Sequence, residues 1–248
     1  MIRAATLRPL AARLKRLRDD VRGVAFIEFA YVLPVLVVVG FWGIETANFA
    51  IANLRISQIA ALTADNAGRV RNSIDEADIN ELMTGAKKVG TGIDFANRGR
   101  IILSDLEMNT SDSTKQWIRW QRCSGLKNVT STYGVPKKAD GTTIANATEA
   151  TAPVDMTKSV TTNGATTTPG GMGPAGNQVG SSASTAVMFA EVVYDYKPLI
   201  TDKFLGAKVI RSTAAFNVRQ RTNQTLTNFT QPDTGQPATP SKCNVFAA

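Results

Sequence analysis

The stretch RGVAFIEFAYVLPVLVVVGFW, residues 22–42, decides how this chain is organised. The apolar run extends from Val24 to Ile44, and Glu28 is the only charged residue among these 21. A helix needs roughly 20 mostly apolar residues to cross the hydrocarbon core of a bilayer, so we predict a transmembrane helix over residues 24–44. Glu28 needs an explanation, because a charge at mid-bilayer costs about 2.5–3.5 kcal/mol on insertion scales. The simplest explanation is a position near the cytoplasmic end, from which the carboxylate reaches the headgroups.

The segment before this run is strongly basic. Of the net charge of +8, residues 1–22 contribute +5, from seven basic and two acidic side chains. A basic segment directly before an apolar helix stays on the cytoplasmic side, so we predict a cytoplasmic leader over residues 1–23 and export of the chain after about residue 45. The uneven distribution also favours a membrane over nucleic acid as the partner of this basic charge.

Three kinds of segment fit the run: a cleaved secretory signal, a signal anchor and a pilin-type segment. A secretory signal is cleaved after its apolar region, next to small residues. Here the run is followed by FWGIE, residues 41–45, which is a poor site of that kind. We therefore expect the run to stay attached to the rest of the protein.

The surroundings of Glu28 resemble the processing signal of type IV prepilins, in which a basic leader, a glycine and four residues precede a glutamate. Here these are Gly23, then VAFI at 24–27, then Glu28. Over residues 22–70, and more loosely in the C-terminal part, the chain resembles the TadE-like pseudopilins, with the core EFAYVLP at 28–34 and a further acidic residue, Glu45. That family, with its relatives TadF and TadG, comprises minor pilin-like components of the bacterial tight-adherence (Flp) pilus assembly system.

The resemblance implies that a prepilin peptidase cuts the chain between Gly23 and Val24 on the cytoplasmic side. Glu28 would then be the fifth residue of the mature chain, where its carboxylate pairs with the α-amino group of a neighbouring subunit. Val24 departs from the phenylalanine with which many major pilins begin. The implied partners are the membrane, the peptidase, other pilin or pseudopilin subunits and the assembly machinery. The implied location is the inner membrane, single-pass, with a cytoplasmic N-terminus and a periplasmic or extracellular C-terminal domain.

The helix is expected to kink and to continue beyond the membrane. Pro34 removes one backbone hydrogen bond, although an ordinary tolerated membrane proline is an equally good interpretation. An apolar stripe near helical spacing follows the span, at Ile44, Ala47, Ile51, Leu54, Ala61 and Leu62. Further apolar residues lie off this stripe, at Phe49, Ile56 and Ile59. Such broad coverage indicates burial on more than one side, by the protein's own sheet and by neighbouring subunits, or else a simple core helix.

The remaining chain shows one more helix and four strands. A helix is predicted from about Ile74 to Val89, because SIDE at 73–76 has the spacing of a capping box and glycines follow at 90 and 92. Strand patterns occur in RIILSDLEMN from 100, KQWIRWQRC from 115, TAVMFAEVVYDY from 185 and AKVIRSTAAFNVRQR from 207. The first two predict a hairpin. The fold class is α+β: a long N-terminal transmembrane helix that continues into an exported domain with an antiparallel sheet of about four strands.

This organisation divides the exported part into a helical segment at 45–92, a β-rich domain at 93–221 and a C-terminal tail at 222–248. Residues 124–184 are rich in Thr, Gly, Ala, Ser and Asn. Such a composition buries little apolar surface to offset the ordering entropy, so we expect a long mobile insertion there, and a similarly loose tail.

Cys123 and Cys243 are the only cysteines. In an oxidising compartment they are expected to form a disulfide that ties the tail to the end of the second strand, and two free thiols are the alternative. In the chain-entropy picture a loop of this length gives roughly 4–5 kcal/mol of stabilisation.

The composition argues against catalysis. The chain contains no histidine, which excludes Ser-His-Asp and Cys-His sites and most zinc sites. Asp105 and Glu107 share one face of a strand, where we expect them to be solvated. We therefore expect no enzyme activity, no catalytic residues, no metal and no cofactor. The alternatives to a pseudopilin are an uncleaved signal-anchored adhesin or binding protein and, third, a membrane-tethered hydrolase with carboxylates in an acidic cleft.

Overall fold

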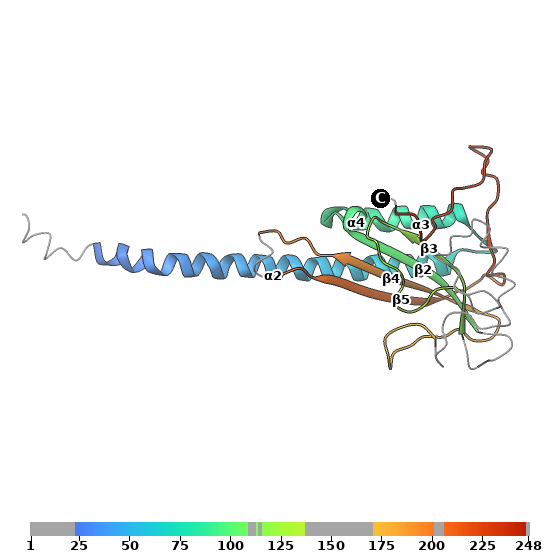
Figure 1. Ribbon diagram of the computed structural model, residues 1–248, viewed down its shortest axis with the longest axis horizontal. Coiled ribbons are helices and arrows are strands. Elements are labelled where there is room, and N and C mark those ends of the chain that lie inside the picture. The colour runs from blue at the N-terminus through green and yellow to red at the C-terminus, as the bar shows by residue number, and fades with distance from the viewer. Residues whose placement is uncertain (1–22, 109–112, 114–115, 137–170, 201–205, 247–248) are drawn as a thin grey trace, which may run out of the picture.

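A long helix organises the computed structural model, which describes residues 23–108, 113, 116–136, 171–200 and 206–246 (Figure 1). Helix α2 comprises Val24–Arg69, 46 residues, and contains Pro34 without ending there. At 1.5 Å per residue its length is about 70 Å, twice what a bilayer core requires. The predicted helix and its continuation beyond residue 44 are confirmed.

A four-stranded antiparallel sheet lies along the C-terminal half of α2 (Figure 1). Its strands are β2 (Gly99–Met108), β3 (Gln116–Ser124), β4 (Ala186–Asp195) and β5 (Val209–Asn217). Their order is β3-β2-β4-β5, and each neighbouring pair is antiparallel. The predicted hairpin is β2 with β3, so the α+β fold class and the number of main strands are confirmed.

The core lies between α2 and the sheet. The helix contributes mostly small or β-branched side chains, and the sheet contributes larger ones. These include Ala52, Ile56, Ile59, Ala60 and Ala64 from α2, and Ile101, Leu103, Trp120, Met188 and Val192 from the sheet. The backbones of α2 and β5 approach each other closely at Gly68, where a Cβ atom would lie 3.1 Å from the carbonyl oxygen of Asn217.

The outward face of α2 is apolar as well. Ile51 is 52% exposed and Leu54 65%, and both belong to the predicted stripe. Ile56 and Ile59, which lie off that stripe, are fully buried against the sheet. The sheet therefore covers the face beside the stripe, and the stripe itself stays open.

The second helix, α3, comprises Glu76–Val89, and its predicted capping box at 73–76 is wrong. Asp75 caps the helix: its Oδ1 accepts from the backbone N of Ala77 at 2.9 Å, and its own N donates to Oδ2 of Asp78 at 3.0 Å. The cap lies later because the preceding residues form strand β1 (Ile74–Asp75), which pairs in parallel with β6 (Leu226–Thr227). Two short elements without a sequence signal follow α3, η2 (Thr91–Ile93) and α4 (Phe95–Arg98).

The prediction of a mobile insertion is wrong for its two ends, which pack on the sheet face opposite α2. Met172 is buried and forms a β-bridge with Val179. The ring of Tyr133 meets that of Phe189 edge-on, with centroids 5.5 Å apart. The reason is that this sheet face is apolar and must be covered. The middle of the predicted insertion, residues 137–170, lies outside the described residues.

The tail is also more ordered than predicted. Leu226 is fully buried in the core, and the disulfide joins Cys243, near the end of the tail, to Cys123 of β3. Asp75 holds the segment after β6 as well, because its Oδ2 accepts from the backbone N of Phe229 at 2.8 Å. Tertiary contacts thus order a segment whose composition alone predicts a loose chain.

Candidate functional site

The first half of α2 is a free apolar helix. Every residue from 23 to 44 is exposed, including Phe26 and Tyr31 at 79% each. Within the described residues, α2 is the one helix that is long and apolar enough to cross a membrane. A core helix of a water-soluble domain would be buried instead, so this surface fits a single-pass membrane anchor covered by lipid or by other protein.

The predicted processing and assembly residues lie at the free end of this helix. Gly23 directly precedes α2, Val24 is its first residue, and Glu28 lies in its second turn with an exposed side chain. Among the residues that the structure describes, none pairs with the Glu28 carboxylate. The structure thus keeps Gly23, Val24 and Glu28 together at one end, remote from the two cysteines.

Glu45 marks the point where the free helix joins the domain. It is the first buried residue of α2, with no exposed surface. The hydroxyl of Tyr196 donates to its Oε1 at 2.5 Å, and the backbone N atoms of Leu199 and Ile200 donate to its Oε2 at 3.1 and 3.0 Å. The carboxylate therefore clamps α2 to the connection after β4.

Tyr196 is held from several sides. Its ring meets that of Phe49 edge-on at 5.0 Å, and its hydroxyl accepts from Nδ2 of Asn48 at 2.8 Å. Burial, together with the hydrogen bond to Glu45, raises the pKa of Tyr196 to about 12. The phenol therefore remains a donor to Glu45 throughout the physiological pH range.

Replacement of Glu45 with glutamine should loosen this joint. The neutral amide has one acceptor oxygen where the carboxylate has two, and the bonds from the backbone N atoms lose the charge of their acceptor. We expect the backbone amides of Leu199 and Ile200 to exchange about 10–100-fold faster, since a hydrogen bond to a charged group contributes roughly 1.5–3 kcal/mol. Hydrogen–deuterium exchange measures the rates of these two amides.

Tyr196→Phe is the matched control, because it keeps the carboxylate and should leave both amides protected. Equal exchange rates in Glu45→Gln and in the unmodified chain would contradict the clamp.

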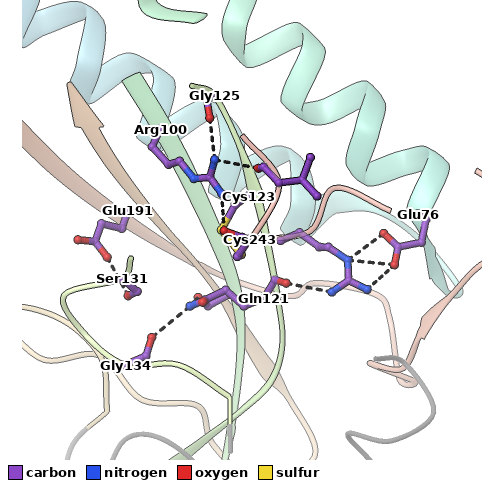
Figure 2. Close-up of a disulfide and its surroundings, with 12 residues drawn as sticks. Glu76, Arg100, Gln121, Cys123, Gly125, Ser131, Gly134, Glu191 and Cys243 are labelled. Atoms are coloured by element: carbon purple, nitrogen blue, oxygen red, sulfur yellow. Dashed lines mark hydrogen bonds and ion pairs between the residues drawn. A yellow bond between two sulfur atoms is a disulfide. The ribbon is translucent and has the colours of Figure 1, made fainter. Parts of the chain in front are cut away.

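A fully buried ion pair joins α3 to the sheet. Glu76 and Arg122 both have no exposed side-chain surface. Nε of Arg122 donates to both carboxylate oxygens of Glu76 at 3.0 Å, its Nη2 donates to Oε1, and its Nη1 donates to the carbonyl of Gln121 at 2.9 Å. Figure 2 shows Glu76 reaching from α3 toward the strand that carries the disulfide. The predicted role of Glu76 in a cap is replaced by this pairing.

The predicted disulfide between Cys123 and Cys243 is confirmed, with Cα atoms 4.7 Å apart. Beside it, Arg100 holds the end of the tail (Figure 2). Its Nη2 donates to the carbonyl of Cys243 at 2.6 Å, and its Nη1 donates to the carbonyls of Gly125 and Val245 at 2.7 and 3.0 Å. Burial lowers the pKa of Arg100 to about 10, so its guanidinium stays charged at neutral pH.

The expectation that Asp105 and Glu107 are solvated is wrong. Asp105 is fully buried, and neither of its carboxylate oxygens has a hydrogen-bond partner within the described part of the chain. Burial and, secondarily, the charge of Glu107 raise the pKa of Asp105 well above its usual range, while Arg221 and Arg119 oppose this. Glu107 instead accepts from Nε of Arg119 at 2.9 Å. Strand β2 pairs with β4 without a shift from Gly99 to Glu107, and the extra residue of the irregularity beside Asp105 lies in β3. Asp105 and Glu107 therefore point to the same sheet face as Ile101 and Leu103, the face that packs against α2.

Asp105→Asn should stabilise the folded chain at neutral pH. The unfolded chain releases this proton near pH 4, whereas the folded chain retains it to higher pH, so folding loses stability as the pH rises from about 4 toward the raised pKa. We expect the asparagine variant to gain about 1–3 kcal/mol at pH 7 and nothing at pH 4. Thermal unfolding across this pH range measures the difference. Asp65→Asn, which weakens the partly exposed pairs with Arg69 and Arg219, is the control and should not stabilise; a stability difference for Asp105→Asn that does not change with pH would contradict the assignment.

A hollow borders α2 on the side of α3. A pocket of about 390 Å³ lies between α2 and α3, lined in part by Leu62, Leu82, Asp78 and Glu81. Asp78 is already engaged in the cap of α3. Within the described residues, no group of three Cys, Asp or Glu side chains is placed to hold a metal ion.

Comparisons of the chain with models of protein families, with curated proteins and with solved structures found no match.

Proposed function

We propose that this chain is a pilin-like structural protein, a minor pseudopilin in the assembly of a bacterial tight-adherence (Flp-type) pilus that supports surface attachment. The observation that carries the proposal is the division of α2 into a free apolar half, with Glu28 near its start, and a half that packs on a sheet. A helix of this kind is an assembly element attached to a folded domain. The role is structural and requires no catalytic group.

The open stripe beyond the junction supports assembly over simple anchoring. Ile51 and Leu54 remain exposed beyond the junction, and Leu62 is exposed beside the hollow between α2 and α3, so these residues extend the apolar surface out of the membrane. A signal anchor needs apolar surface only within the bilayer and does not require an exposed apolar stripe beyond it. Neighbouring helices of the same kind would cover both the span and the stripe.

In the proposed mechanism, prepilin peptidase cuts between Gly23 and Val24 on the cytoplasmic face of the inner membrane. The cut removes the basic leader and leaves an α-amino group at Val24. The exposed carboxylate of Glu28 then pairs with the α-amino group of an adjacent subunit. The attraction is strong because the pair forms in a medium of low dielectric constant, and it offsets the desolvation of both charges. The domain beyond Glu45 lies on the periplasmic or extracellular side.

Mass spectrometry of the protein isolated from its own cells tests the cleavage. An N-terminus at Val24 is expected, whereas an intact Met1 or Ile2 would overturn cleavage and favour the uncleaved adhesin or binding protein. Gly23→Leu is a useful control, because a Cβ atom at position 23 meets nothing within 4 Å and should leave the fold intact. That variant should accumulate with its leader attached.

Glu28→Ala should abolish incorporation into pili without harming membrane insertion. Removal of the carboxylate makes insertion easier, by up to about 2.5–3.5 kcal/mol, but leaves the neighbour's α-amino group without a counter-charge. Immunolabelling of purified pili together with membrane fractionation measures both effects. Glu81→Ala on the exposed side of α3 is the matched control and should assemble normally. Normal pili from a stable Glu28→Ala protein would show that the ion pair has no role.

A further inference from the structure

Residues 196–200, which directly follow β4, lie at the level where α2 leaves the predicted span. Figure 1 shows this segment extending past the end of the sheet, along α2 toward the free half. The backbone N atoms of Leu199 and Ile200 lie 3.1 and 3.0 Å from the carboxylate of Glu45, the residue directly after Ile44. The clamp at Glu45 therefore fixes this segment beside the boundary of the hydrocarbon core.

The side chains at this level suit a lipid interface. Leu199 is 66% exposed and Ile200 38%, although both are apolar. Lys197 beside them is exposed and basic, and on α2 the exposed Trp42 lies one turn before Glu45. Apolar residues next to an interfacial tryptophan and a lysine are typical of segments that enter the headgroup region.

The tilt of α2 does not remove the segment from this region. Transmembrane helices tilt by about 20° on average, and an element about 10 Å from the helix axis then shifts in depth by about 3 Å. The headgroup layer is roughly 5–7 Å thick on each side. Because α2 carries residues 197–200 at a set height, the bilayer surface lies next to them wherever no other subunit intervenes.

We propose that the segment at residues 197–200, through Leu199 and Ile200, enters the headgroup region of the bilayer and gives the protein a second membrane contact. Lys197 lies at the level of the lipid phosphates, where anionic headgroups attract it. For a tilted α2, the contact favours the tilt direction that brings this side of the helix toward the bilayer. This inference rests on the membrane insertion of α2 in the proposed function.

Spin labelling of the full chain in vesicles of phosphatidylethanolamine and phosphatidylglycerol tests the contact. Both native cysteines are in the disulfide, so a single introduced cysteine is labelled selectively without reductant. Leu199→Cys is compared with Val35→Cys in the middle of the span and with Phe229→Cys. Phe229 is 60% exposed and follows β6, which pairs with β1 beyond the far end of α2. Relaxation by oxygen, which enters lipid, and by a water-soluble nickel chelate reports the depth of each label.

We expect the ratio of oxygen to nickel accessibility at position 199 to be several-fold higher than at 229 and lower than at 35. A ratio at 199 equal to that at 229, with position 35 still in lipid, overturns the second contact and leaves the membrane span intact. A label at 199 that is shielded from both reagents also overturns it, because another protein copy then covers the site. If position 35 itself is open to the nickel chelate, the span fails and the second contact fails with it. Ile200→Cys repeats the measurement at the neighbouring side chain and should give the same result as position 199.

Discussion

A chain with both Cys123 and Cys243 replaced by alanine should lose roughly 4–5 kcal/mol of unfolding free energy. The disulfide joins residues 120 positions apart, and in the chain-entropy picture a crosslink of that span restricts the unfolded chain by about this amount. Alanine is suitable because both sulfur atoms lie in buried surroundings, with Ile102 packed beside them. Chemical denaturation of the full chain in detergent, followed by near-ultraviolet circular dichroism, measures the loss.

Reduction provides the control for this prediction. Dithiothreitol should lower the stability of the unmodified chain to nearly that of the double alanine variant and leave the variant unchanged. Arg100 would still hold the carbonyls of Cys243 and Val245, so the tail should loosen without a general loss of the sheet. A difference below about 1 kcal/mol between oxidised and reduced chains would contradict the chain-entropy account of this crosslink.

Arg122→Met should lower the unfolding free energy by about 3–5 kcal/mol. Methionine fills much of the same volume, but it leaves the carboxylate of Glu76 fully buried with its main partner removed. Denaturation in the same detergent measures the effect, and α3 should separate from β3 first. The double variant Glu76→Leu with Arg122→Met should recover most of the loss, because neither charge then has to be buried.

Arg219→Met is the matched control. Arg219 pairs with Asp65 at 2.9 Å, but 52% of its side chain is exposed, so the loss should stay below about 1 kcal/mol. Equal losses for Arg122→Met and Arg219→Met would mean that water reaches Glu76 when the domain fluctuates. The comparison separates the effect of burial from that of the charge pair itself.

Local patterns were sufficient for the two longer helices and the four main strands of this fold. The apolar run at 24–44, the strand patterns at 100–123 and the two cysteines each carry a signal within a few neighbouring residues, and the structure agrees with each. The apolar run around Pro34 likewise predicted that this proline lies inside a helix. The short turn of α4 around Phe95 was missed, because four residues are too few to show a period.

The sequence of α2 does not indicate which of its faces is buried. Ile51, Leu54, Ile56 and Ile59 are equally apolar, and a helix that is apolar on several sides gives no preferred direction. The sheet covers Ile56 and Ile59 because its strands approach that side. The open side therefore became visible only in the folded chain.

The sequence alone determined that a membrane-type helix precedes an α+β domain, because hydrophobic runs and alternation are properties of adjacent residues. It did not determine what each carboxylate does. Glu45 accepts from Tyr196, 151 positions away, and Glu76 pairs with Arg122, 46 positions away. Asp105 is buried without either kind of partner. Only the tertiary structure decided these three roles, since the charge and hydrogen bonding of a carboxyl group depend on its burial and on donors brought from distant parts of the chain.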